Sequence, residues 1–157
     1  MDAFAALVEE AELESRHLAQ IGALLDEERA ALTAGLAARL EEIVAEKINQ
    51  VQALELCARR RDERLRALGF APGQRGLMAC QAAHPQGARL RALWNRIAEQ
   101  AAAARDGNAL NGRLIEARLQ QVQARLAQLA STAGEAVGYG ADGRAHARPP
   151  SRALGRV

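Results

Sequence analysis

The chain has 157 residues, enough for one domain with a modest core, and 49% of them are apolar. Alanine, leucine, glutamate, glutamine and arginine dominate while aromatic residues make up only 3%, a composition typical of helical bundles and unlike that of sheets. The net charge of +2 is too small to indicate a polyanionic partner, and no apolar run approaches the roughly 18 residues that a membrane span requires.

The first predicted helix covers about residues 2–33. Apolar residues recur every three or four positions from Phe4 to Leu32, the pattern of a long helix that packs at a shallow angle on its neighbours. Asp2 suits the N-cap, and eight carboxylates against two arginines make residues 1–32 acidic. Gly35 is able to adopt the left-handed conformation that ends a helix.

The second predicted helix covers about residues 36–68 and is closed by Gly69. The short connection at Gly35 predicts an antiparallel hairpin, with one continuous bent helix as the alternative. Residues 69–88 contain four glycines and two prolines and are predicted to form a loop. Within this loop Leu77–Ala79 are expected to form one short helical turn that covers the end of the bundle.

The third predicted helix covers about residues 86–132, with Pro85 suited to its first turn. Its apolar seam is predicted to run through Leu90, Trp94, Ile97, Ala101, Ala104, Asn108, Asn111, Ile115, Leu119, Val122, Leu126 and Leu129. The predicted fold is therefore all-α: residues 1–133 form an antiparallel bundle of three long helices with coiled-coil-like packing. Residues 134–157 are basic and lack apolar periodicity, which predicts a disordered tail.

Two asparagines distinguish the third helix. Asn108 and Asn111 are three residues apart, so we expect both on one face. An amide in an apolar seam costs stability unless it is satisfied, and it fixes which helix packs where. The pair is expected to set the register of the bundle or to recognise a partner helix, two roles that do not exclude each other. Gly112 leaves room for the close approach of another backbone.

Catalytic and metal sites are not indicated. Cys80 and His84 lie near each other but have no second pair of ligands, and the three histidines form no arrangement with a nucleophile and an orienting carboxylate. We therefore expect no enzyme, no metal and no cofactor. The basic run Arg59–Arg66 contains Asp62 and Glu63, so it reads as a solvated helix face rather than a nucleic-acid site.

The order of motifs from residue 108 onward resembles that of a known family. Asn108-Ala-Leu-Asn-Gly-Arg-Leu-Ile115, a leucine helix and then Tyr139-Gly-Ala-Asp-Gly143 are similar to the flagellar export chaperones of the FlgN type. A weaker match in the first half consists of Leu24-Leu25-x-x-Glu28, Gly35 and a second helix that holds Lys47. Leu36 departs from the pattern, because members often carry an acidic residue there.

The resemblance implies a cytoplasmic chaperone for flagellar type III export. Such chaperones bind the terminal helices of hook–filament junction proteins, prevent their premature assembly and deliver them to the export gate. It implies that Tyr139 docks on the cytoplasmic domain of the gate. The client-binding residues, several of which are expected to line a groove of the bundle, would be Asn108, Asn111, Gly112, Leu114, Ile115, Leu119, Val122, Leu126 and Leu129.

Other features bear on location and on other classes of protein. The acidic amino terminus lacks a secretion-signal layout, and two unpatterned cysteines, Cys57 and Cys80, suit a reducing compartment. Neither nucleic-acid binding nor membrane insertion is expected, and weak self-association stays open. The alternatives are a self-associating coiled-coil scaffold, in which the groove pairs with a second copy, and a nucleic-acid-associated helical protein.

Overall fold

The structure, a computed structural model, describes residues 2–139 and 145–147. It consists of α1 (Ala3–Ala34), α2 (Ala37–Ala67), α3 (Gly73–Ala83) and α4 (Gly87–Ala136), followed by the short strands β1 (Val137–Tyr139) and β2 (Ala145–Ala147). The all-α fold is confirmed. Within the described residues, however, there are four helices where the sequence predicted three.

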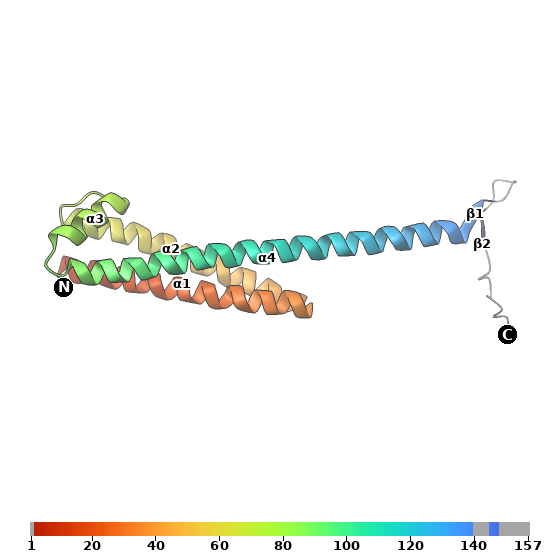
Figure 1. Ribbon diagram of the computed structural model, residues 1–157, viewed down its shortest axis with the longest axis horizontal. Coiled ribbons are helices and arrows are strands. Elements are labelled where there is room, and N and C mark those ends of the chain that lie inside the picture. The colour runs from red at the N-terminus through yellow and green to blue at the C-terminus, as the bar shows by residue number, and fades with distance from the viewer. Residues whose placement is uncertain (1, 140–144, 148–157) are drawn as a thin grey trace. The chain divides into compact units, whose positions relative to one another are not determined.

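The chain divides into two compact units, and the division falls inside α4. The first unit comprises residues 1–114 and the second residues 115–157. In the first unit α1, α2 and the first half of α4 lie side by side, and α3 lies near the amino terminus of α1 (Figure 1).

The termini of α1 follow the signals in the sequence. The Asp2 side chain accepts a hydrogen bond from the Phe4 N–H at 3.3 Å, and Gly35 ends the helix with a φ of 73°. Two partly buried ion pairs join α1 to α2, Glu14 with Arg61 and Glu28 with Lys47. The earlier residue of α1 pairs with the later residue of α2, so the two helices run in opposite directions. The predicted antiparallel hairpin is therefore confirmed, and the continuous bent helix is excluded.

The region predicted to be a loop with one helical turn forms the eleven-residue helix α3. The prediction of a loop was wrong because the helix itself requires a glycine. A Cβ at Gly76 would overlap the Ala71 carbonyl oxygen, and glycine in a sequence is otherwise a signal for a loop. Leu77 and Cys80 of α3 are fully buried and close one end of the core. The core residues there are Phe4, Leu7, Val8, Ala11, Leu18, Leu65, Leu77, Cys80, Leu90 and Ile97.

The second unit contains the end of α4 and the tail. α4 continues to Ala136, and Val137–Tyr139 pair with Ala145–Ala147 as an antiparallel ladder with Gly138 opposite His146. The predicted disorder of residues 134–157 is thus not what the backbone shows at these two strands. Residues 140–144 and 148–157 lie outside the described part of the chain, where the prediction remains untested.

Candidate functional site

A buried polar cluster joins the three long helices of the bundle. Asn111 of α4 is 1% exposed, and its side-chain N–H groups donate to the Leu25 carbonyl and to Glu28 Oε2, both at 2.8 Å. Arg29 Nε donates to Asn111 Oδ1 at 3.3 Å. Lys47 of α2 donates to both oxygens of Glu28, at 2.9 and 3.0 Å. Every polar atom of the Asn111 side chain is therefore used within the chain.

The two asparagines that the sequence predicts to lie on one face have different environments in the structure. Asn108 is exposed whereas Asn111 is buried, so the prediction that both lie in the seam is wrong for Asn108. The seam passes instead through Gly107, where a Cβ would lie 3.4 Å from Leu25 Cδ1. Asn111 accordingly acts inside the bundle, where its side chain is covered by α1.

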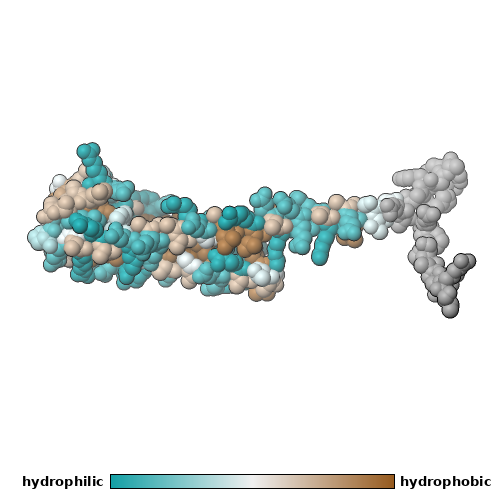
Figure 2. All heavy atoms as spheres, in the orientation of Figure 1, coloured by the Kyte–Doolittle hydropathy of each residue, from teal (hydrophilic) through white to brown (hydrophobic). Residues whose placement is uncertain are grey.

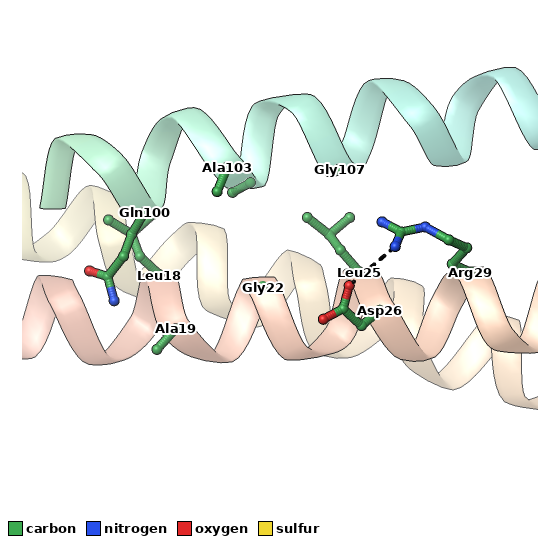
Figure 3. Close-up of a pocket in the computed structure, with 10 residues that line it drawn as sticks. Leu18, Ala19, Gly22, Leu25, Asp26, Arg29, Gln100, Ala103 and Gly107 are labelled. Atoms are coloured by element: carbon green, nitrogen blue, oxygen red, sulfur yellow. Dashed lines mark hydrogen bonds and ion pairs between the residues drawn. The ribbon is translucent and has the colours of Figure 1, made fainter. Parts of the chain in front are cut away.

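The close approach of another backbone that was expected at Gly112 is not found there. Nothing lies within 4 Å of a Cβ built at Gly112, and this residue is exposed. Between α1 and α4 lies a cleft of about 210 Å³, and half of the ten residues that line it are alanine or glycine. Leu25 of α1 points toward α4 beside Gly107 (Figure 3). A methyl group at Gly107 would meet Leu25 at ordinary van der Waals distance, so the packing of α4 on α1 does not require glycine at this position.

The second buried pair lies nearer the α3 end of the bundle. Arg61 Nη1 donates to both oxygens of Glu14, at 2.9 and 3.0 Å, and the Arg61 guanidinium stacks 4.8 Å from the Trp94 ring centre. Burial raises the pKa of Glu14, and Arg61 partly opposes this effect. Because Arg61 is occupied in this way and Arg59 pairs with Glu55 at 3.8 Å, the Arg59–Arg66 run offers less free positive charge than its sequence implies.

A groove on the bundle lies between α2 and α4. It has a volume of about 430 Å³, and its floor includes Leu18 of α1. Leu54 and Ala58 line one side, and Trp94 and Ala101 line the other. Sequence reasoning expected a groove, but not these residues, since Trp94 and Ala101 had been placed in the packed seam.

An exposed apolar surface lies on the second unit. Among the predicted client-binding residues, five form a stripe on α4 whose members are 48 to 66% exposed: Ile115, Leu119, Val122, Leu126 and Leu129. We call this set the α4 stripe. Leu114, by contrast, is half-buried in the first unit. Figure 2 shows apolar side chains at the surface among mostly polar ones.

Tyr139 lies in β1, where it pairs with Ala145. The position of its side chain lies outside the described part of the structure, so its predicted role stays a prediction.

The partners of Asn111 have only weak signals in the sequence. Glu28 and Lys47 belong to motifs quoted for the family resemblance, and Glu14 and Glu28 stand at apolar positions of the first helix's repeat. A carboxylate at a seam position indicates a buried charge with a partner. Which cation pairs with which carboxylate follows only from the alignment of α1 with α2.

The described residues were also compared with the requirements of a reactive cysteine, a metal site and a membrane span. The cysteines are free and buried, and burial raises the pKa of both the Cys57 and the Cys80 thiols. No group of three histidine, cysteine or carboxylate side chains in the described ranges is placed to hold a metal ion. None of the helices there is both long and apolar enough to cross a membrane.

The fold and this surface define the class, an all-helical protein whose last helix carries an uncovered apolar stripe. The chain belongs to the FlgN family, because the model of the FlgN protein family matches residues 1–147. It is also similar to the crystal structure of a candidate flagella synthesis protein FlgN from Pseudomonas aeruginosa, with 28% identity and a TM-score of 0.62. That match covers 69% of this chain and 85% of the other. A search of curated proteins gave no match. The resemblance inferred from the motifs is confirmed, and the chain is a flagellar protein.

Proposed function

We propose that the protein is a cytoplasmic chaperone of flagellar type III export, without enzymatic activity. It binds the terminal helices of hook–filament junction proteins, prevents their premature assembly and delivers them to the export gate. The observation that carries the proposal is the α4 stripe in a chain of the FlgN family.

The spacing of the stripe suits a partner helix. Its members are separated by four, three, four and three residues, which is the seam of a coiled coil over two heptads. Covering a large apolar side chain contributes up to about 1.5–3 kcal/mol when burial is complete. Five half-exposed side chains therefore offer several kcal/mol to an amphipathic helix laid along them.

The other residues that the sequence predicts to bind a client have two different roles in the structure and the proposal. Asn108 and Gly112 are exposed and stay in the proposal as client contacts, whereas Asn111 and Leu114 serve packing within the first unit. Tyr139 is proposed to dock on the export gate, as the family resemblance implies.

The test uses the full chain and peptides from the carboxyl-terminal segments of hook–filament junction proteins of the same organism. Val122→Asp and Leu126→Asp should each weaken binding at least about tenfold, which corresponds to about 1.4 kcal/mol. Both side chains are exposed, so the melting temperature should stay within about two degrees. Met78→Asp is the matched control, because Met78 is as exposed as Leu126 (60%) but lies on α3. Normal binding by both stripe variants would contradict the proposal.

Delivery is tested separately from binding. Tyr139→Ala should bind the same peptides with unchanged affinity, because it leaves the α4 stripe intact, and should reduce client secretion and motility. Unimpaired secretion by this variant would assign recognition of the gate to another surface.

The same stripe also favours the second candidate, a self-associating scaffold. Light scattering of the full chain separates the two. A stable dimer that dissociates in Val122→Asp, together with no affinity for junction-protein peptides, would favour the scaffold.

A further inference from the structure

The groove between α2 and α4, called the α2/α4 groove below, has an apolar wall on α2 that extends past its lining residues. Val44, Ile48 and Val51 of α2 are 46, 53 and 49% exposed. They lead into Leu54 and Ala58, which line the groove. Their spacing of four and three residues places them on one side of the helix. The first unit therefore offers an uncovered apolar surface of its own, apart from the α4 stripe.

The α4 wall of this groove combines small residues with two arginines. Trp94, Ala98 and Ala101 line the groove, and the same spacing of three and four residues continues to Arg91 in one direction and to Arg105 in the other. Both arginines are exposed, and neither makes an ion pair or a side-chain hydrogen bond with another described residue. They are fourteen residues apart, which is about 21 Å along the helix. The α4 wall is therefore a narrow apolar surface between two cations.

We infer that the α2/α4 groove binds an amphipathic helix that carries carboxylates two heptads apart along the edge facing α4. Carboxylates in those positions would pair with Arg91 and Arg105. Large aliphatic side chains of the same helix would pack between Trp94 and Val51, and the alanines of the α4 wall leave room for its backbone. The inference rests on the proposed function and extends it, because it gives the chaperone a second helix-binding site.

Charges on the opposite wall determine which edge of the helix carries the carboxylates. Glu41 and Glu55 continue the spacing of the apolar residues on α2. Glu55 is only weakly paired, since its distance to Arg59 is 3.8 Å and both side chains are exposed. A carboxylate that faced α2 would be repelled by these glutamates, whereas one that faces α4 is attracted by the arginines. The groove therefore distinguishes the two edges of its occupant.

A second copy of this chain and a lipid surface are poorer occupants. The uncovered helical segment of another copy, residues 115–129, contains one carboxylate, Glu116, and two arginines. It therefore lacks a pair of carboxylates for Arg91 and Arg105. Helices that lie in a membrane interface present one apolar face to the lipid, whereas the α2/α4 groove is a concave surface with Leu18 in its floor.

Trp94 reports directly on occupancy of the groove. It lines the groove, is half-buried and is the only tryptophan in the chain. A helix that lies in the groove should shift the emission of Trp94 to shorter wavelength, whereas a helix bound to the α4 stripe should leave this emission unchanged. Tryptophan emission and the anisotropy of a labelled peptide therefore separate the two sites.

The experiment titrates the full chain with three labelled peptides of four heptads each, all without tryptophan. Each carries leucine at the seam, and two edge positions fourteen residues apart hold glutamate, glutamine or lysine. At low salt the glutamate peptide should shift the emission of Trp94 and bind roughly fivefold more tightly than the glutamine peptide, and the lysine peptide should bind more weakly. At about 0.5 M salt the preference should fall below about twofold.

Variants of the chain assign the site to residues. Arg91→Gln combined with Arg105→Gln should abolish the preference for glutamate. Arg16→Gln combined with Arg96→Gln removes the same charge from a different cleft, between α1 and α4, and should retain the preference. Val51→Asp should weaken the binding that shifts the Trp94 emission at least about tenfold. Because Val51 is exposed, the melting temperature of this variant should stay within about two degrees of the wild type.

The contrary results are distinct from one another. Peptide binding that leaves the Trp94 emission unchanged and is abolished by Val122→Asp refutes the groove site and leaves the proposed function standing. A shift of the emission with equal affinity for all three peptides refutes the carboxylate edge. No binding of any peptide refutes the inference outright, and a dimer that dissociates in Val51→Asp would then assign the groove to a second copy. The proposed function fails separately, when the junction-protein segments do not bind the α4 stripe.

Discussion

The buried amide of Asn111 provides the sharpest test of the bundle. Its side chain makes two hydrogen bonds to α1 as a donor, one to the Leu25 carbonyl and one to the carboxylate of Glu28. Replacing it with leucine removes a hydrogen bond to a charged group, worth about 1.5–3 kcal/mol, and a neutral one worth about 0.5–1.5 kcal/mol. The leucine gains some apolar burial in return, so we expect a net loss of about 2 kcal/mol.

This expectation reverses the one drawn from sequence. A seam asparagine usually costs stability, so Asn108→Leu with Asn111→Leu is expected from the sequence to raise the melting temperature. The contacts of Asn111 reverse the expected change in stability. Leucine would leave the Leu25 carbonyl and the Glu28 carboxylate without one of their partners in a buried site.

The assay is urea unfolding followed by circular dichroism, with the free energy of unfolding obtained by linear extrapolation. Asn111→Leu should lower that free energy by about 2 kcal/mol and the melting temperature by roughly 5–15 °C. Asn108→Leu, an exposed neighbour on the same helix, is the control and should stay within about 0.5 kcal/mol of the wild type. An Asn111→Leu variant as stable as the wild type would refute the reasoning.

Three further predictions concern other positions of the first unit. Because burial raises the pKa of Glu14, its contribution to stability is full below its unfolded pKa and is lost as the pH rises through its folded pKa. Urea melts should therefore show the wild type gaining stability relative to Glu14→Gln as the pH falls from about 7 to about 4; a constant difference would contradict this. Gly112→Ala should raise the melting temperature by replacing an exposed helical glycine, a gain of up to about 1 kcal/mol, whereas Gly76→Ala should lower it sharply because its Cβ meets backbone; equal shifts would refute the packing of α3. A thiol reagent should modify Cys57 and Cys80 slowly in the native protein and rapidly in denaturant, and fast native labelling would show that α2 and α3 open readily.

Most of the secondary structure follows from local signals. The repeat of apolar residues from Phe4 to Leu32 predicts α1, and Asp2 and Gly35 define its ends because capping involves only adjacent residues. The same reasoning gives α2 and α4 and, from the short connection, the antiparallel hairpin. The motifs from Asn108 to Gly143 identified the family, since they are read directly from the order of residues.

The spacing of apolar residues defines only loosely which side of a helix faces its neighbours. Asn108 and Asn111 differ by about 60° around the helix axis, so either of them fits a stripe drawn through the apolar residues. Asn111 is inside because its side chain contacts Leu25 and Glu28 of α1, whereas Asn108 stays outside. Spacing along one helix carries no information about these contacts, which depend on the neighbouring helix.

The sequence by itself determined the three long helices, the hairpin, the family and the spacing of the α4 stripe, because each depends on residues within a few turns of one another. Only the tertiary structure decided that Asn111, Glu28 and Lys47 meet, since they come from three helices and their pairing is a property of helix alignment. It also decided that residues 73–83 form a helix. A glycine signals a loop from the properties of its own backbone, but at Gly76 it is required by the nearby Ala71 carbonyl.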